Sequence, residues 1–111
     1  MLGRDMPILV VDDNATFVRV VCGLLTNLGY LNFHAAYDVE QARERLRAET
    51  FGLVICDWTQ GDGTGLDLAR EAGGKALVTV AAWNVEAVRG TGLSWLVKPF
   101  TAAELMAKLP V

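Results

Sequence analysis

Short β-rich segments, most of them largely apolar, alternate with helical patterns, and this alternation is the feature that most constrains the fold of this chain of 111 residues. The first such segment, residues 7–11, is typical of a strand buried on both faces of a sheet. We expect five strands, at residues 7–11, 31–35, 51–56, 76–82 and 93–97. Strands that alternate with helices pair in parallel through right-handed crossovers, which place helices on both faces. The sequence therefore predicts an α/β fold, a three-layer sandwich around a parallel five-stranded sheet.

Helix-boundary signals agree with this alternation. Gly29 ends a helical pattern that runs through residues 17–28. The segments Asp38 to Gln41 and Thr101 to Glu104 both have the spacing of a capping box, and each opens an amphipathic pattern. A further helix is expected at residues 66–72, and Asn84 is expected to cap a helix of only a turn or two.

Composition excludes several classes of protein. A net charge of -3 argues against direct nucleic-acid binding, which needs a basic surplus. No apolar run approaches the roughly 18 residues needed to span a bilayer, and no signal peptide precedes the first strand, so we expect a cytoplasmic protein. The length predicts one domain, residues 1–111, with no effector domain, as a monomer or weak homodimer. Cys22 and Cys56 are expected to be free thiols.

Charged residues follow three of the expected strands at their carboxyl ends, where parallel sheets gather their functional groups. Asp12 and Asp13 follow the first strand, Asp57 the third and Lys98 the fifth. In the strand order 2-1-3-4-5 the first and third strands are neighbours, so the three carboxylates converge. Each like-charge pair at about 4 Å costs roughly 1–4 kcal/mol. Such a cluster needs a compensating cation, and Mg²⁺ suits carboxylates, water and a phosphate.

Three motifs in this order resemble those of response-regulator receiver domains. They are Val10 to Asp13, Cys56-Asp57 followed eight residues later by Gly65, and Val97 to Phe100. The resemblance covers the chain from Pro7 to the last helix and implies the flavodoxin-like (βα)5 fold, with strand order 2-1-3-4-5. It also implies a cis peptide bond before Pro99.

The resemblance assigns a role to each charged residue. Asp57 matches the phosphoacceptor, which takes a phosphoryl group from a histidine kinase or phosphotransfer protein. Asp13 and Asp12 match the residues that hold Mg²⁺, and the backbone carbonyl of Thr59 matches a further ligand. Lys98 matches the lysine that pairs with the phosphoryl oxygens. The chemistry implied is phosphoryl transfer by positioning and charge neutralisation.

Three residues, Gln60, Gly61 and Ala81, depart from the receiver pattern, and Thr79 and Trp95 are further candidates of the switch region. Receivers usually have Met-Pro where this chain has Gln60 and Gly61. The end of the fourth strand usually carries a Ser or Thr, where this chain has Ala81; Thr79, two residues earlier, could replace it only with a shifted register. Trp95 occupies the position of the switch aromatic.

These features favour a phosphorylatable switch that acts by protein–protein contact, on a downstream target bound at the face of the fourth helix, fifth strand and fifth helix. Its only catalysis would be its own phosphorylation and dephosphorylation. A pseudo-receiver that binds partners without phosphate is the alternative, favoured by Ala81, Gln60 and Gly61. A metal-dependent phosphohydrolase would need Asp-x-Asp after the first strand, and a flavodoxin would need a Ser/Thr-rich phosphate loop there.

The three tryptophans are scattered along the chain. We expect them to be partly buried packing residues rather than a ligand cage. They are Trp58, Trp83 and Trp95.

Overall fold

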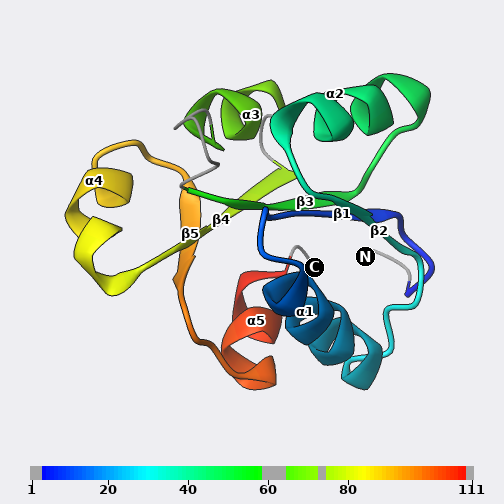
Figure 1. Cartoon of the computed structure of the whole chain (residues 1–111). Helices are drawn as coiled ribbons and strands as arrows, with labels where there is room; N and C mark the ends of the chain where they lie inside the picture. The colour runs from blue at the N-terminus through cyan, green and yellow to red at the C-terminus, as the bar shows by residue number, and fades with distance from the viewer. Residues whose placement is uncertain (1–3, 59–64, 73–74, 110–111) are drawn as a thin grey trace.

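The computed structural model describes residues 4–58, 65–72 and 75–109 and contains a five-stranded parallel sheet (Figure 1). The strands are β1 (Ile8–Val11), β2 (Phe33–Ala36), β3 (Leu53–Asp57), β4 (Ala76–Val80) and β5 (Ser94–Val97). Their order is β2-β1-β3-β4-β5. The predicted fold class and strand order are therefore confirmed.

Helices cover both faces of the sheet. They are α1 (Ala15–Asn27), α2 (Val39–Ala48), α3 (Gly65–Ala72), α4 (Val85–Arg89) and α5 (Ala102–Lys108). In Figure 1, α1 and α5 lie together on one side of the sheet, and α2 and α3 lie together on the other. Each side of the sheet has its own apolar cluster, and α4 belongs to the side of α2 and α3 because its Val88 is buried there.

The central strands are buried throughout, as their apolar composition predicts. Every residue of β1, β3 and β4 is buried. Alternate side chains point to opposite faces, so Ile8 and Val10 enter the cluster under α1 and α5, whereas Leu9 and Val11 enter the cluster under α2 and α3. The backbone at the carboxyl edge of this rigid sheet fixes where the charged residues lie.

The predicted helix boundaries are largely confirmed. Gly29 has a left-handed backbone (φ +91°) two residues after α1 ends. Thr101 and Glu104 form the reciprocal bonds of a capping box at α5. At α2, Asp38 accepts a bond from the backbone of Gln41, but the Gln41 side chain accepts one from the backbone of Tyr37 instead of that of Asp38.

Several expected strand boundaries shift by one or two residues. The second strand begins at Phe33, the third continues through Asp57, and the fourth ends at Val80. A 3-10 turn, η2 (Ala82–Asn84), follows β4, and the Asn84 side chain makes no capping bond to α4, contrary to expectation.

Two further expectations concern the cysteines and the absence of a membrane-spanning segment. Cys22 and Cys56 are free thiols, as predicted. Within the described part of the chain, no helix has the length and apolar character that crossing a membrane requires.

Candidate functional site

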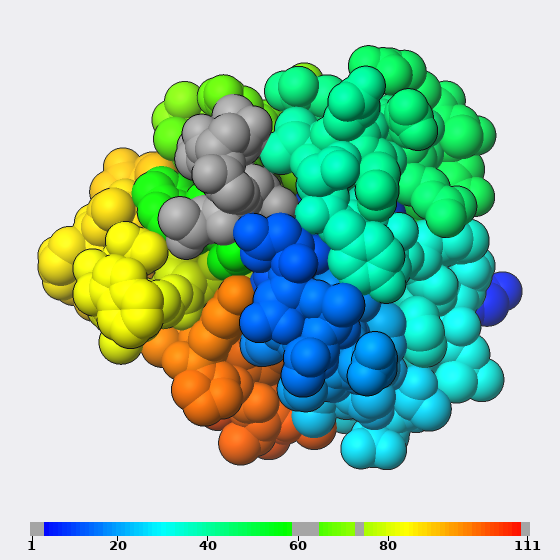
Figure 2. Space-filling model, in the orientation of Figure 1, coloured from blue at the N-terminus to red at the C-terminus, as the bar shows by residue number. Residues whose placement is uncertain are grey.

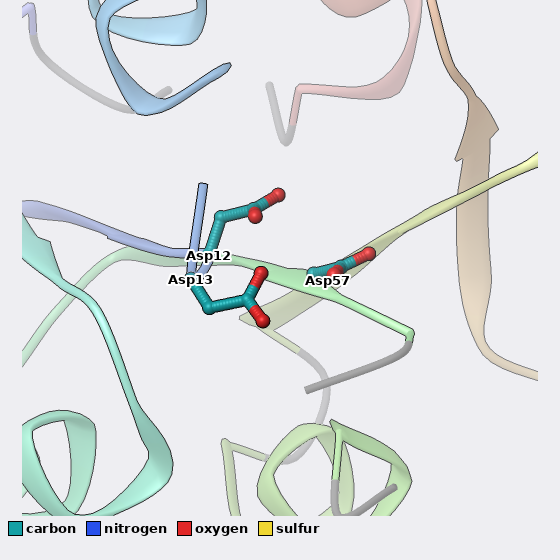
Figure 3. Close-up of side chains that lie close together, drawn as sticks. All are labelled: Asp12, Asp13 and Asp57. Carbon is teal, nitrogen blue, oxygen red and sulfur yellow. The ribbon is translucent and has the colours of Figure 1, made fainter. Parts of the chain in front are cut away.

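Three carboxylates converge at the carboxyl ends of the neighbouring strands β1 and β3. Asp12 and Asp13 directly follow β1, and Asp57 is the last residue of β3 (Figure 3). One oxygen from each lies within 4.8 Å of the others. Asp12 and Asp57 are buried, whereas Asp13 is exposed. The structure thus brings together the three acidic residues that the strand-end rule selected.

Lys98 provides a positive charge to two of these carboxylates. Its Nζ lies 2.8 Å from Asp12 Oδ2 and 3.1 Å from Asp57 Oδ1. The lysine directly follows β5, and its backbone N–H donates to the carbonyl of Val80 in β4 at 2.8 Å. The Lys98-Pro99 peptide bond is cis, as the family resemblance implied.

Both carboxylate oxygens of Asp12 have a polar partner. Oδ1 accepts a hydrogen bond from the backbone N–H of Asn14 at 2.9 Å, while Oδ2 pairs with Lys98. Asp13 has no ion pair within the described part of the chain. Lys98 therefore pairs with two of the three carboxylates, and within the described residues Asp13 has no cationic partner. This set of hard oxygen donors, with one carboxylate open to solvent, fits a divalent cation that keeps several water ligands.

Phe17 is a neighbour of Lys98 that sequence reasoning missed. Lys98 Nζ lies 4.2 Å from the centroid of the Phe17 ring. The ring also makes an edge-to-face contact with Phe100, with centroids 5.7 Å apart and planes at 83°. Its position in the sequence could have indicated this contact. Phe17 lies in the first turn of the helix that starts just after Asp12 and Asp13, at the same edge of the sheet.

Cys56 lies beside Asp57 but does not offer a competing nucleophile. Burial raises the pKa of its thiol to about 12, and the Asp57 charge acts in the same direction. The side chain is fully buried and packs in the cluster under α2 and α3. A thiol with this pKa stays protonated near neutral pH, and the thiolate is the reactive form.

Gly65 brings the start of α3 against the backbone at the end of β3. A Cβ atom at this position would lie 2.3 Å from the Asp57 carbonyl oxygen and 2.6 Å from that of Trp58. No real Cβ approaches backbone so closely, so only glycine permits this contact. The sequence placed Gly65 in a family motif, and the structure supplies the steric reason.

The register of β4 against β3 determines which β4 residue pairs with Asp57 and which residue follows at the end of the strand. Asp57 pairs with Thr79 in the sheet, and Thr79 is buried. Ala81 follows the last residue of β4 with an extended backbone, so it faces the same side as Thr79, one pleat further along. Ala81 thus comes directly after the end of β4, and it has no hydroxyl group.

The tryptophans only partly match expectation. Trp58 and Trp95 are half-buried and pack against the cluster under α2, α3 and α4. Trp83 is 85% exposed, so the expectation of partial burial is wrong for it. It lies in the short turn η2, none of whose residues enters the core. The Trp95 ring has Arg89 at 6.0 Å and Lys108 at 5.8 Å from its centroid.

Three candidate residues of the loop after β3 fall outside the described residues. They are Thr59, the expected carbonyl ligand, and Gln60 and Gly61, which replace the usual Met-Pro. Their roles stay predictions from sequence.

A parallel sheet of this order, with a cluster of carboxylates and a lysine at the carboxyl ends of its strands, is typical of signalling domains that accept phosphoryl groups. The family model for the response regulator receiver domain matches residues 8–110. The chain belongs to this family. Its members act as signalling phosphoacceptors rather than as conventional enzymes, and membership implies a histidine kinase as partner.

Two similar proteins are named chemotaxis proteins. The chain is 33% identical to chemotaxis protein CheY-3 of Vibrio cholerae, in an alignment that covers 98% of this chain and 92% of that protein. It is also 33% identical to chemotaxis protein CheY of Pseudomonas aeruginosa, with 94% and 93% covered.

Solved structures support the same fold. A putative response regulator from Chloroflexus aurantiacus superposes with a TM-score of 0.80 at 22% identity, covering 93% of each chain. A response regulator protein from Burkholderia pseudomallei, solved with a phosphorylated aspartic acid, a calcium ion and citrate, gives 0.77 at 26% identity. That alignment covers 96% of this chain and 68% of the other.

Proposed function

We propose that this protein is a signalling switch that accepts a phosphoryl group on Asp57 and passes the signal on by protein–protein contact. The observation that carries the proposal is the position of Asp57 between two further carboxylates and the Lys98 ammonium, 3.1 Å from its Oδ1. The Burkholderia response regulator, solved with a phosphorylated aspartic acid and a calcium ion, supports the acceptor chemistry.

Asp57 would act as the nucleophile. Its carboxylate oxygen attacks the phosphorus of a phosphohistidine on a histidine kinase or phosphotransfer protein. The new P–O bond forms as the P–N bond breaks, and the imidazole leaves with the electron pair. Hydrolysis later returns the free carboxylate and inorganic phosphate. The Cys56 thiol, with its pKa raised to about 12, does not compete.

Asp12, Asp13 and Asp57 would hold Mg²⁺, and the carbonyl of Thr59 is proposed as a fourth ligand. The bound ion supplies charge neutralisation for the transferring group. Lys98 already contacts Asp57 and would remain beside the oxygens of the phosphoryl group. Asp13 is the exposed member of the set and would give the ion its open side.

The output surface we propose is the face formed by α4, β5 and α5. Trp95 of β5 is the candidate switch residue, and cations from both helices, Arg89 and Lys108, lie near its ring. A downstream protein would bind here, with the switch as a monomer or weak homodimer of one receiver domain. The chain itself, with its net charge of -3, is not expected to bind nucleic acid.

One observation favours a second function. Ala81 stands where a hydroxyl would follow the phosphoryl group, so phosphate could fail to move the output surface. Thr79 is the other candidate on this strand, but it lies within the sheet, opposite Asp57. A pseudo-receiver would keep the fold and bind partners regardless of phosphate.

Treatment with acetyl phosphate and Mg²⁺ tests the first proposal. Intact-mass analysis should show one added phosphoryl group on the wild type and none on Asp57→Asn or Asp57→Ala. Omission of Mg²⁺ should strongly reduce the labelling. Equal labelling of wild type and both variants would exclude Asp57 as the acceptor.

A further inference from the structure

The Lys98 ammonium is enclosed by groups of two different kinds. On one side it contacts Asp12 Oδ2 at 2.8 Å and Asp57 Oδ1 at 3.1 Å. It also lies over the face of the Phe17 ring, 4.2 Å from the centroid. The side chain is 24% exposed, so water reaches only part of it. Of these three contacts, the aromatic face is the one that involves no carboxylate, so it would remain if the carboxylates took up a cation or a phosphoryl group.

Two contacts hold Phe17 in place, one made by its backbone and one by its ring. Its backbone N–H donates to the Asn14 side chain at 3.1 Å, which holds the first turn of α1 in place. Its ring packs edge-to-face on Phe100, which is buried and lies two residues after Lys98. In Figure 2 the start of α1, in blue, lies directly against the orange segment that follows β5. Phe17 therefore has little freedom to move away from the lysine.

An aromatic face attracts an ammonium because the ring carries negative charge density above its plane. The lysine side chain is flexible, and such a contact restricts the positions of its ammonium group. An aliphatic side chain of similar size in place of the ring would not attract the ammonium. The attraction grows when the site is shielded from water, as it is here.

We propose that Phe17 is a positioning residue that holds the Lys98 ammonium beside Asp57, ready for the anionic group that Asp57 receives. This inference rests on the proposed function, because it assigns a purpose to the lysine. The Phe17 ring contacts Lys98 on the side of the site and Phe100 in the apolar packing, so its effect on the site should pass through Lys98.

The test compares Phe17→Leu, which removes the aromatic face, with Phe17→Tyr, which keeps it. Phe33→Leu is the matched control: Phe33 is a half-buried phenylalanine against the same apolar cluster, but it pairs with Ile8 at the opposite end of the sheet. The probe is beryllofluoride, a phosphoryl mimic, titrated in the presence of Mg²⁺.

Phe17→Leu should weaken beryllofluoride binding by about threefold to tenfold, the range of a partly shielded cation–π contact. Phe17→Tyr and Phe33→Leu should stay within about twofold of wild type. In a Lys98→Met background, Phe17→Leu should have no further effect, because the two residues act as a unit. Equal losses in Phe17→Leu and Phe33→Leu, or an undiminished loss in the Lys98→Met background, would overturn the proposal.

A second measurement is independent of phosphoryl chemistry. The ε-methylene protons of Lys98 should show an upfield ring-current shift by NMR in wild type and Phe17→Tyr, and should lose it in Phe17→Leu. If wild type fails to bind beryllofluoride, the proposed function fails while this shift still tests the contact. Absence of the shift in wild type would overturn the positioning role, even if Phe17→Leu does not fold.

Discussion

Asp13 differs from the two carboxylates beside it because Lys98 compensates only Asp12 and Asp57. It lies at the start of the loop into α1, exposed to solvent, while its carboxylate stays within 4.8 Å of the other two. At such distances like charges repel even near the surface. The negative charge of Asp13 therefore costs stability whenever no cation is bound.

Asp13→Asn should raise the melting temperature in EDTA by about 2–5 °C, because it removes this repulsion. Added Mg²⁺ should raise the melting temperature of wild type more than that of the variant, since a ligand stabilises only the state that binds it. Differential scanning calorimetry measures both. Asp67→Asn, an exposed aspartate in the first turn of α3, is the matched control and should bring no gain.

If Asp13→Asn melts below wild type in EDTA, the carboxylate makes a structural contact instead. The electrostatic account of the site would then be wrong for this residue.

At the scale of elements, the site depends on how closely α3 approaches β3. Gly65, the first residue of α3, lies against the carbonyl oxygens of Asp57 and Trp58. Any side chain there would push the helix away from the strand that ends in Asp57. The glycine thus couples the packing of one helix to the position of the acidic cluster.

Gly65→Ala should destabilise the protein by about 1–3 kcal/mol, because the helix or the strand end has to move. Gly23→Ala gives a control of opposite sign: Gly23 lies inside α1 with nothing within 4 Å of its Cβ position, so alanine should stabilise by about 0.5–1 kcal/mol. Urea unfolding measures both. A Gly65→Ala variant as stable as wild type would show that the contact relaxes freely.

The sequence was most informative where pattern and position coincide. Short β-rich runs predicted all five strands, and the rule for parallel sheets placed Asp12, Asp13, Asp57 and Lys98 at one edge. Strand ends were less certain, because an acidic residue such as Asp57 can belong to the strand or to the loop. The hydrophobic pattern identifies the strands and helices, whereas tertiary packing determines at which residue each of them ends.

Two features depended on contacts that no local pattern encodes. Phe17 reads as an ordinary core position of a helix, and only the packing of α1 beside the segment after β5 brings it to Lys98. Trp83 reads as a packing residue, but it lies in the turn η2 after β4, none of whose residues is buried, and it is exposed to solvent.

For the molecule as a whole, the open question is how a change at Asp57 reaches the surface of α4, β5 and α5. The path would run past Ala81 at the end of β4 to Trp95 of β5. A shift between two states needs an interaction that differs between them, and Ala81 cannot supply a hydrogen bond to a phosphoryl oxygen. We therefore expect a weak or permanently set aromatic switch.

Ala81→Thr should strengthen the coupling between phosphorylation and Trp95, because it restores a hydroxyl at the strand end. With Trp58 and Trp83 replaced by phenylalanine, Trp95 fluorescence should respond little to beryllofluoride and Mg²⁺ in the Ala81 protein. The response should at least double in Ala81→Thr. A large response that Ala81→Thr leaves unchanged would show that the switch does not require the hydroxyl.

The central claim is that Asp57, and neither of its acidic neighbours, carries the phosphoryl group. The most direct measurement treats the protein with acetyl phosphate and Mg²⁺, reduces the acyl phosphate with borohydride to homoserine, and locates that residue by peptide mass spectrometry. The account predicts homoserine at position 57 only, dependent on Mg²⁺. Homoserine at position 12 or 13, or none at position 57 after the intact protein has gained a phosphoryl group, would contradict it.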